Sequence, residues 1–548
     1  MNLLHKFLER EEYLDYNDFF DNCKIKVPDN FNFGYDIIDE YAKLQPNKRA
    51  LVWCNDKHEE KFFTFSDISL ISNQIANLFI SLGLKKGDVV MTMLNRRWEY
   101  WVTAVACHKL GLPIVPATYM LTPKDIIYRA KGAGVKCLIS TNEESVLNNI
   151  EESREGISDV ILFSVEDNKG FRNFNKEFEA QSASLDKVET QLCEELLIYF
   201  TSGTTGYPKM VSHNHLYPIG HIYNAKYWHN VVDDGLHFTA AETGWAKCSW
   251  GKIYGQWIAG TAIFVYDYFG KFDPTDLLDH IPKYHIDTFC APPTIYRYLI
   301  KSDLTKYDLR SLSHCSTAGE PLNAEVFKQF YSATGLKIYE GYGQTETSII
   351  LGTFNMVDIR PGSMGKACPQ YDIHLIDASY NDVENGEVGE IVIKIRKPQC
   401  GLLYQYHGNP ELTENLLGNG YHHTGDLAYR DEDGYYWFIG RSDDIIKSSG
   451  YRIGPFEVES ALHEHPAVLE CAITGIPDPV RGQIIKATVV LTKNYTPSAA
   501  LVKELQDHVK NTTAPYKYPR IIEFVTELPK TISGKIRRVE IRKNDETK

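Results

Sequence analysis

The segment from Leu196 to Lys209 contains the residues whose types and order most clearly indicate chemistry. An apolar run, LLIYF, leads into TSGTTGYPK, which carries several hydroxyl side chains, two glycines and one lysine. Glycines let backbone N–H groups approach an anion closely, hydroxyls add donors, and Lys209 adds a positive charge. The spacing differs from the GxxxxGK[ST] phosphate loop. The segment therefore predicts a phosphate site of another kind, with a solvent-exposed turn rich in Ser, Thr and Gly as the alternative.

A second candidate is Lys535, which lies in the glycine-containing triplet SGK near the C-terminus. A lysine on a short turn is a flexible point charge that can approach a site and leave it. The alternative is a solvated basic tail, because several other basic residues surround it: Lys530, Arg537, Arg538, Arg542 and Lys543.

The elements that must position these residues alternate between short apolar runs and amphipathic segments from about residue 89 to 343. The expected strands are Val89–Leu94, Ile114–Thr118, Val160–Val165, Leu196–Phe200, Ala262–Tyr266 and Lys337–Tyr342. The expected helices are Trp98–Leu110, Asp276–His285 and Ala324–Ala333. This alternation predicts an α/β fold with mostly parallel sheets covered by helices.

The pattern changes in the C-terminal third of the chain. Short β-prone runs around polar turns predict a small antiparallel sheet or β-barrel at about 363–440. The polar segment RSDDIIKSSGYR follows, and then a helix–strand pattern of about one hundred residues that predicts a compact α+β domain. We place the domain boundary at Asp443, which gives domains at 1–442 and 443–548.

Composition excludes several classes of protein. The 548 residues are 43% hydrophobic and 24% charged, with a net charge of −14 that disfavours broad attraction to nucleic acid or anionic membranes. No stretch approaches the ~18–20 apolar residues of a membrane span, and the N-terminus becomes charged too early for a secretory signal. Eleven cysteines without a CxxC pair argue against a disulfide framework or a thiolate zinc site. The sequence predicts a soluble cytoplasmic protein.

TSGTTGYPK resembles the phosphate loop of the adenylate-forming superfamily, which includes acyl-CoA synthetases, luciferases and the adenylation domains of peptide synthetases. Four further segments match in order: AGEPL (318–322), YGQTE (342–346), YHHTGD (421–426) with GRSDDIIKSSGYRIGPFEVE (440–459), and PKTISGK (529–535). The chain is most similar to medium-chain acyl-CoA synthetases and acetyl-CoA synthetase-like ligases, through GWAKCSWGKIYGQW (244–257) and APYKYPR (514–520). The resemblance implies a large N-terminal domain of two α/β subdomains with a small β-barrel, followed by a mobile α+β domain.

The resemblance also implies a reaction in two steps. A carboxylic acid attacks the α-phosphate of ATP and releases pyrophosphate, and the acyl group of the acyl-AMP then passes to the thiol of coenzyme A. ATP, Mg²⁺ and coenzyme A are the implied cofactors and substrates, and neither nucleic acid nor a membrane is an implied partner. The first step brings two anions together, so charge neutralisation and positioning must dominate catalysis.

Residue roles are carried over motif by motif. The β- and γ-phosphates are assigned to Thr201, Ser202, Gly203, Thr204, Thr205, Gly206 and Lys209. The adenine side of the nucleotide site is assigned to Gly319, Glu320 and Pro321, and the rest of the nucleotide-binding set comprises Glu340, Gly341, Tyr342, Gly343, Gln344, Asp426, Arg441 and Arg452. Within it, Asp426 accepts hydrogen bonds from the ribose hydroxyls and Arg441 contacts ribose or phosphate. Thr345 contacts the α-phosphate, and Glu346 holds Mg²⁺.

Lys535 is the implied catalytic residue, together with Thr345 and Glu346. It would bridge the substrate carboxylate and the α-phosphate, and a rotation of the C-terminal domain about Asp443 would then withdraw it. Coenzyme A is assigned to Ser449, Gly450, Tyr451, Arg481, Tyr518 and Arg520, with Arg452 near the same path. Because one lysine carries a whole half-reaction, its acetylation is a predicted means of control.

Gly343 bears on the choice of acid, because acetate-specific relatives place a tryptophan immediately before the QTE triplet. A glycine there leaves room for an alkyl chain, at about 0.8 kcal/mol per buried methylene. We expect Trp245, Trp250 and Trp257 to line or back this acyl pocket, with core packing as the alternative for at least one of them. The sequence therefore favours a short-to-medium-chain acid, branched and aryl acids included, over acetate.

Three other functions remain as alternatives. The chain could be an acetate or propionate ligase, or it could adenylate an acid and load a separate carrier protein. A non-catalytic nucleotide sensor with the same fold is the third, and the presence of Lys209, Glu346, Asp426 and Lys535 argues against it.

Overall fold

The structure is a computed structural model that describes residues 2–201, 208–270, 273–396, 399–417, 420–449, 451–530 and 535–546, without the side chains of Arg452 and Glu546. Five residues of the predicted phosphate loop, Ser202, Gly203, Thr204, Thr205 and Gly206, lie outside the described residues, as does Gly450. The mixed α/β class predicted from the sequence is confirmed.

An eight-stranded sheet contains the strand that leads into the phosphate motif. Its order is β19-β9-β8-β4-β3-β5-β6-β7, and the pairs among β8, β4, β3, β5, β6 and β7 are parallel. Every residue of β3 is buried, as expected of a central strand covered on both faces. The strands are β3 (Val89–Met93), β4 (Ile114–Pro116), β5 (Val135–Ser140), β6 (Ile161–Ser164), β7 (Arg172–Asn173), β8 (Glu195–Thr201), β9 (Lys209–Asn214) and β19 (Gln405–Tyr406).

A nine-stranded sheet provides the second α/β layer, in the order β16-β15-β14-β13-β12-β10-β11-β1-β2. Its centre is parallel, and the antiparallel pairs involve β2, β15 and β16 at its two ends. The strands are β1 (Arg49–Asn55), β2 (Glu60–Thr64), β10 (Leu236–Thr239), β11 (Ala262–Asp267), β12 (Thr288–Cys290), β13 (His314–Ala318), β14 (Ile338–Tyr342), β15 (Leu351–Gly352) and β16 (Lys366–Ala367).

Two smaller sheets follow. Strands β17 (Asp372–Ile376), β18 (Gly389–Lys394), β20 (Tyr421–Arg430) and β21 (Tyr436–Arg441) form an antiparallel sheet whose described edges are β17 and β21. The segment 363–440 therefore holds an open sheet rather than a closed barrel. The last sheet contains β22 (Ile446–Ser448), β23 (Tyr451–Ile453), β24 (Val468–Asp478), β25 (Gly482–Leu491) and β26 (Ile521–Val525). The predicted boundary at Asp443 falls between these two sheets.

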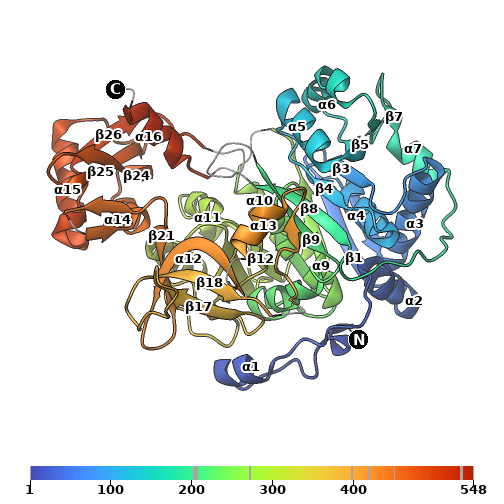
Figure 1. The fold of residues 1–548 in the computed structure, drawn as a ribbon, viewed down its shortest axis with the longest axis horizontal. Helices are drawn as coiled ribbons and strands as arrows, with labels where there is room; N and C mark the ends of the chain where they lie inside the picture. The colour runs from blue at the N-terminus through green and yellow to red at the C-terminus, as the bar shows by residue number, and fades with distance from the viewer. Residues whose placement is uncertain are drawn as a thin grey trace.

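Helices cover both large sheets, and three helices pack with the last sheet to form a separate lobe (Figure 1). The helices of the large body are α1 (Tyr16–Asn22), α2 (Glu40–Leu44), α3 (Phe65–Ser81), α4 (Glu99–Leu110), α5 (Pro123–Ala133), α6 (Glu144–Glu152), α7 (Phe174–Glu179), α8 (Ala246–Gly251), α9 (Tyr254–Ile258), α10 (Asp276–Tyr284), α11 (Pro293–Leu299), α12 (Ala324–Thr334) and α13 (Pro410–Leu416). The lobe contains α14 (Pro455–His463), α15 (Ala499–Thr512) and α16 (Arg538–Glu546).

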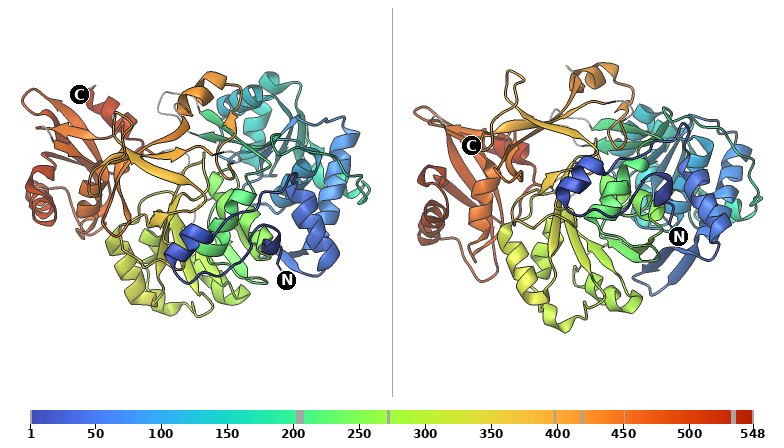
Figure 2. Two further views of the ribbon diagram at one scale, coloured as in Figure 1. Left: turned by 60° about the horizontal axis from the view of Figure 1, so that its bottom comes forward. Right: turned by 90° about the horizontal axis from the view of Figure 1, so that it is seen from below.

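The N-terminal segment with α1 runs along the outside of the large body (Figure 2). Phe19 of α1 packs against Phe354 with ring centroids 5.4 Å apart, and the Tyr16 hydroxyl donates to the Ala367 carbonyl at 2.8 Å. All eleven cysteines are free thiols, and every one except Cys193 is buried. Among the described helices, none has the length and apolar character to cross a membrane.

Candidate active site

The hairpin of β8 and β9 positions the two described ends of the phosphate motif. Thr201 and Lys209 are paired residues of this hairpin. The Lys209 ammonium lies 5.6 Å from the ring centroid of Tyr406, whose strand, β19, extends the same sheet. The hairpin therefore fixes the backbone position of Lys209, and the Tyr406 ring stabilises the lysine's positive charge by a cation–π interaction.

Tyr406 also contacts the predicted Mg²⁺ ligand. Its hydroxyl donates to Glu346 Oε1 at 3.0 Å, and the Leu403 N–H donates to the Glu346 carbonyl at 2.6 Å. Burial raises the pKa of Glu346, while the hydrogen bond from Tyr406 and the positive charges of Lys209 and Arg441 oppose that rise. A bound cation would favour the ionised carboxylate further, so Glu346 is suited to a hard ion that also binds phosphate oxygens. Sequence reasoning missed Tyr406, which lies in the unassigned segment YQYHGNPE.

Asp426 receives hydrogen bonds from the YGQTE segment. The Tyr342 hydroxyl donates to its Oδ2 at 2.6 Å, and Gln344 Nε2 donates to the same oxygen at 2.7 Å. Gln344 also donates to the Thr424 carbonyl at 2.8 Å. Arg441 is the register partner of Asp426 on β21, with its Nη1 4.0 Å from Oδ1. One carboxylate oxygen is thus committed to the protein, while Oδ1 faces the arginine.

Lys535 lies within electrostatic reach of this carboxylate. Burial raises the pKa of Asp426, and hydrogen bonds from Tyr342 and Gln344 oppose the rise together with the charges of Arg441 and Lys535. The side chain of Lys535 is exposed. The charge of Lys535, on the C-terminal lobe, therefore reaches the Asp426 carboxylate of the large body.

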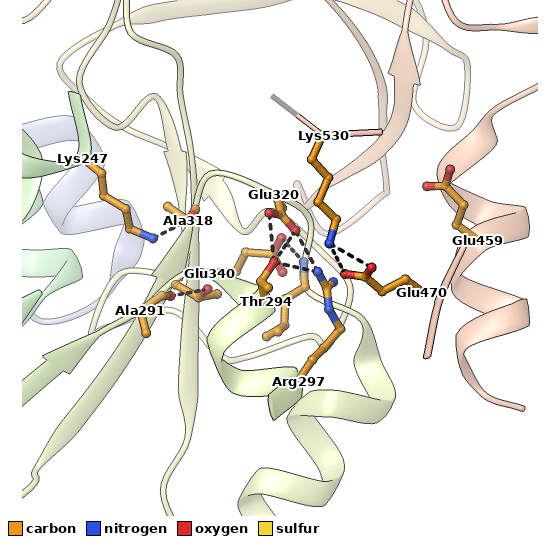
Figure 3. A network of polar contacts seen from close by, with 12 residues as sticks. Lys247, Ala291, Thr294, Arg297, Ala318, Glu320, Glu340, Glu459, Glu470 and Lys530 are labelled. Atoms are coloured by element: carbon orange, nitrogen blue, oxygen red, sulfur yellow. Dashed lines mark hydrogen bonds and ion pairs between the residues drawn. The ribbon is translucent and has the colours of Figure 1, made fainter. Parts of the chain in front are cut away.

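The loop after β13 contains the predicted adenine-side residues. Gly319 has φ +101°, a conformation that favours glycine, and Pro321 follows Glu320 in the loop. Glu320 accepts hydrogen bonds from Arg297 Nη2 at 3.0 Å and from the Thr294 hydroxyl at 3.1 Å, both on α11 (Figure 3). Arg297, absent from the sequence-based set, thus holds this loop in place.

Glu340 holds the other end of the same loop. Its Oε1 accepts the Leu322 N–H at 3.0 Å, and burial raises its pKa to about 8. The side chain is only 6% exposed. Its observed contact therefore ties β14 to the adenine-side loop.

His213 positions the backbone of Thr345. Its Nε2 lies 2.8 Å from the Thr345 carbonyl oxygen, and its ring stacks on Tyr217 with centroids 3.7 Å apart. Burial lowers the pKa of His213 to about 4, so the ring is neutral at physiological pH. Because a carbonyl only accepts, Nε2 must carry the proton. The histidine lies in VSHNH, directly after the phosphate motif, and sequence reasoning did not select it.

Trp250 occupies the space beside Gly343. A Cβ at position 343 would lie 2.5 Å from Trp250 Cη2, so this indole packs directly on the glycine. Gly341 is likewise packed against Trp228: a Cβ at position 341 would lie 2.5 Å from Trp228 Cε2. The room that we expected Gly343 to leave for an alkyl chain is therefore taken, beside the glycine itself, by an indole from α8.

The other two tryptophans of the motif differ from Trp250. Trp245 precedes α8 and is half-buried. Trp257 is fully buried, stacks on Phe33 with centroids 6.3 Å apart and donates its indole N–H to the Ala50 carbonyl at 2.9 Å. The contacts of Trp257 are those of a core residue, which was the alternative considered for one of the three.

Lys247 adds a half-buried positive charge, between Trp245 and Trp250 in the sequence. Its Nζ donates to the Ala318 carbonyl at 2.7 Å, at the carboxyl end of β13 (Figure 3). Burial lowers its pKa, and the nearby charge of Lys535 lowers it further, whereas Cys290 and Glu320 oppose the change. The residue lies inside GWAKCSW, yet its chemistry was not part of the sequence-based prediction.

The described coenzyme A candidates lie in the C-terminal lobe. The Ser449 N–H donates to the Arg481 carbonyl at 2.8 Å, and Arg481 Nη1 donates to the Ser449 hydroxyl at 3.3 Å. Tyr451 stacks on Tyr516, with centroids 4.0 Å apart. Tyr518 and Arg520 form a separate pair, in which the guanidinium donates to the phenol oxygen at 2.7 Å. Arg452 lies on β23, and Asp443 accepts from Arg441 Nε at 3.3 Å beside the predicted boundary.

Family models and full-length relatives both match most of the chain. A family model described as AMP-binding enzyme matches residues 38–404, and one described as AMP-binding enzyme C-terminal domain matches residues 457–535. The chain is 40% identical over 546 residues to mouse acyl-coenzyme A synthetase ACSM3, mitochondrial, covering 98% of this chain and 94% of that protein. It is 42% identical over 541 residues to mouse acyl-coenzyme A synthetase ACSM4, mitochondrial, covering 96% and 93% respectively.

Two solved structures extend the comparison. The anthranilate CoA ligase AuaEII in complex with anthranoyl-AMP has a TM-score of 0.86 and 30% identity, covering 95% of this chain and 98% of that one. The Brucella canis acyl-CoA synthetase has a TM-score of 0.72 and 30% identity, covering 95% and 96%.

The hydrogen bond from Tyr342 to Asp426 predicts a pH effect on nucleotide binding. The phenol stabilises the ionised carboxylate, so Tyr342→Phe raises the pKa of Asp426, and the ionised acceptor is lost at a higher pH than in the wild type. A hydrogen bond to a charged group contributes ~1.5–3 kcal/mol, so we expect about tenfold weaker ATP binding at the acid end of the range. The measurement is calorimetric ATP affinity against pH. Tyr429→Phe is the control: Tyr429 lies on β20, the strand of Asp426, but its ring stacks on Trp437, so the variant should leave the pH profile of ATP affinity unchanged.

Proposed function

The chain belongs to the AMP-binding enzyme family as an AMP-forming acyl-coenzyme A synthetase, and we propose that it activates short-to-medium-chain carboxylic acids, branched and aryl acids included. It converts the acid and ATP into acyl-AMP and pyrophosphate, and then transfers the acyl group to coenzyme A with release of AMP. One arrangement supports the proposed roles of individual residues: Asp426 accepts hydrogen bonds from Tyr342 at 2.6 Å and Gln344 at 2.7 Å, and the charge of Lys535 on the lobe lowers the pKa of the same carboxylate.

The proposed adenylation step depends on positive charge supplied from two parts of the chain. Lys209 and Arg441 belong to the large body, and the ammonium of Lys535 arrives with the lobe. Together they offset the repulsion between the substrate carboxylate and the polyphosphate. Glu346 would hold Mg²⁺, oriented by the Tyr406 hydroxyl at 3.0 Å. When bound, that ion neutralises phosphate charge.

We propose domains at 1–442 and 443–548, with the hinge at Asp443. In support, Asp443 lies between β21 and β22, and among the described residues its carboxylate forms an ion pair with the neighbouring Arg441 alone. Rotation about this point would remove Lys535 from the site and bring the Ser449–Tyr451 turn toward the acyl-AMP. The same rotation would move Arg481, Tyr518 and Arg520, the proposed coenzyme A contacts.

Trp250 sets the length and shape of the acid in this proposal. Because its indole fills the space beside Gly343, a straight long chain has less room than the glycine alone suggests. A flat indole also provides a face on which a branched or aromatic acid can pack. The structurally similar AuaEII is named as an anthranilate CoA ligase, which fits an aryl substrate.

A pyrophosphate-release screen over acids from acetate to octanoate, with branched and aromatic members, tests the proposed function. We expect release with acids larger than propionate, and acyl-CoA only when coenzyme A is present. Preference for acetate or propionate would contradict the acid class. Consumption of acyl-AMP by a carrier protein but not by coenzyme A would favour the carrier-loading alternative, and ATP binding without pyrophosphate release for any acid would favour the nucleotide sensor.

Replacing Trp250 should lengthen the acid that the enzyme prefers. Trp250→Leu opens space beside Gly343, and each further buried methylene is worth about 0.8 kcal/mol, or about fourfold in kcat/KM. The measurement is kcat/KM for butanoate, hexanoate and octanoate. Trp257→Leu is the matched control, since it also removes a buried indole and should lower stability while leaving the order of preference unchanged.

Removing the Lys535 ammonium should separate the two half-reactions. We expect Lys535→Ala to lower acyl-AMP formation by ~10²-fold or more, the usual cost of losing a group that stabilises developing negative charge. Thioester formation from supplied acyl-AMP should be retained, because the lysine is withdrawn in that step. Equal losses in both half-reactions would contradict the proposed rotation.

Acetylation of Lys535 would have the same effect as the alanine variant, because it removes the charge. The exposed side chain is accessible to an acetyl donor or an acetyltransferase. Protein acetylated quantitatively at Lys535 should therefore lose acyl-AMP formation and regain it on deacetylation. Full activity of the acetylated protein would disprove this means of control.

The cytoplasmic location predicted from the sequence is kept as a proposal. The mouse relatives carry the word mitochondrial in their names, and that compartment is the alternative.

A further inference from the structure

The described residues on either side of Lys535 in the sequence are tied to one another. Lys530 and Ile536 form an isolated antiparallel bridge, and the Arg537 N–H donates to the Pro529 carbonyl at 2.8 Å. Helix α16 begins directly afterwards, at Arg538. The position of the lysine therefore depends on what fixes this bridge and the first turn of α16 to the rest of the lobe.

Arg538 forms a buried ion pair at that point. Its Nη2 lies 2.7 Å from Glu459 Oε1 and 2.8 Å from Oε2, and Glu459, on α14, is only 7% exposed. Glu459 Oε1 also accepts the Ile473 N–H from β24 at 2.9 Å. The pair therefore joins α16 to both α14 and β24, the elements at the centre of the lobe.

The same guanidinium faces the residue that follows the proposed hinge. Asp444 Oδ2 lies 3.6 Å from Arg538 Nη1, and Asp444 Oδ1 accepts from Arg542 Nη1 at 2.6 Å. The guanidinium of Arg538 thus contacts two carboxylates, those of Glu459 and Asp444. Its donors point in fixed directions within one plane, and a lysine ammonium would not reproduce this geometry. Arg538 is three residues from Lys535, and Asp444 is one residue from Asp443.

We propose that Arg538 is a positioning residue for Lys535: by bridging Glu459 and Asp444, it fixes the lysine-bearing segment relative to the hinge, so that one rotation places the ammonium at the substrate carboxylate. This inference rests on the proposed function of Lys535. A second tie, from Lys530 Nζ to Glu470 Oε1 at 2.7 Å, restrains the other end of the segment (Figure 3). With Arg538 removed, that end would still be held while the α16 end would not.

The first test compares Arg538→Gln with Arg537→Gln in the full-length enzyme. Arg537 is adjacent in the chain and exposed, and among the described residues its one ion pair is with Glu540, in the first turn of α16, at 2.8 Å, so it is a matched control. We expect Arg538→Gln to lower pyrophosphate release by about tenfold or more, with less than about a twofold change in thioester formation from supplied acyl-AMP. Arg537→Gln should change neither rate. Equal losses in both half-reactions for Arg538→Gln would overturn the proposal and leave a stability role alone.

A double-mutant cycle separates positioning from folding. If Arg538 acts through Lys535, then Arg538→Gln should cause no further loss of adenylation in a Lys535→Ala background, and Arg538→Lys should recover only part of the wild-type rate. Additive losses would contradict the proposal. Should Arg538→Gln not fold, Glu459→Gln keeps the shape of the partner and must show the same split between half-reactions. A wild-type enzyme without pyrophosphate release would overturn the proposed function, whereas equal losses in an active enzyme would overturn this inference alone.

Discussion

The hydrogen bonds from Tyr342 and Gln344 to one oxygen of Asp426 connect the parts of the molecule on which the chemistry depends. Tyr342 ends β14 of the nine-stranded sheet, and Asp426 lies on β20 of the four-stranded sheet. Because the same short segment continues to Glu346, the contact also sets where the proposed Mg²⁺ ligand lies relative to the proposed ribose acceptor. Across the β20–β21 register, Asp426 faces Arg441, two residues before the proposed hinge. Nucleotide site and hinge are therefore built on one strand pair.

That arrangement concentrates carboxylates in a buried place, and burial raises the pKa of each of them. Buried carboxylates and a polyphosphate can share a site only if cations are present when the charge is greatest. Lys209 and Arg441 are parts of the large body, whereas Lys535 lies on the separate lobe. In the proposed mechanism, this separation lets Lys535 supply its charge for adenylation and withdraw before the thiol enters.

The sequence predicted the elements well where local patterns decide them. The strand Leu196–Phe200 and the helix Ala324–Ala333 were predicted within one residue at each end, because apolar runs and helix caps are local signals. Motif resemblance likewise selected Asp426 and Glu346. It did not select Tyr406, His213 or Arg297, because their roles depend on tertiary contacts. Tyr406 reaches the site through the pairing of β9 with β19, and His213 through its contact with the Thr345 carbonyl. Arg297 contacts Glu320 because α11 packs against the adenine-side loop. The packing of Trp250 on Gly343 has no local signal either, because 93 residues separate the two positions in the chain.

A lobe that must rotate needs strong contacts within itself and weak ones to its neighbour. The ion pair of Arg538 Nη2 with both carboxylate oxygens of Glu459 lies inside the lobe, so the proposed rotation would leave it intact and the lysine-bearing segment would move as part of a rigid body. Between the lobe and the large body, Asn323 Nδ2 donates to the Ser460 carbonyl at 3.1 Å, a neutral hydrogen bond that water can replace. Because Ser460 is the residue after Glu459, one contact that the rotation would break and the ion pair that would persist are built from neighbouring positions of α14. The two differ in charge: the Arg538–Glu459 pair is ionic and costly to open, whereas the Asn323–Ser460 contact is a neutral amide–carbonyl hydrogen bond.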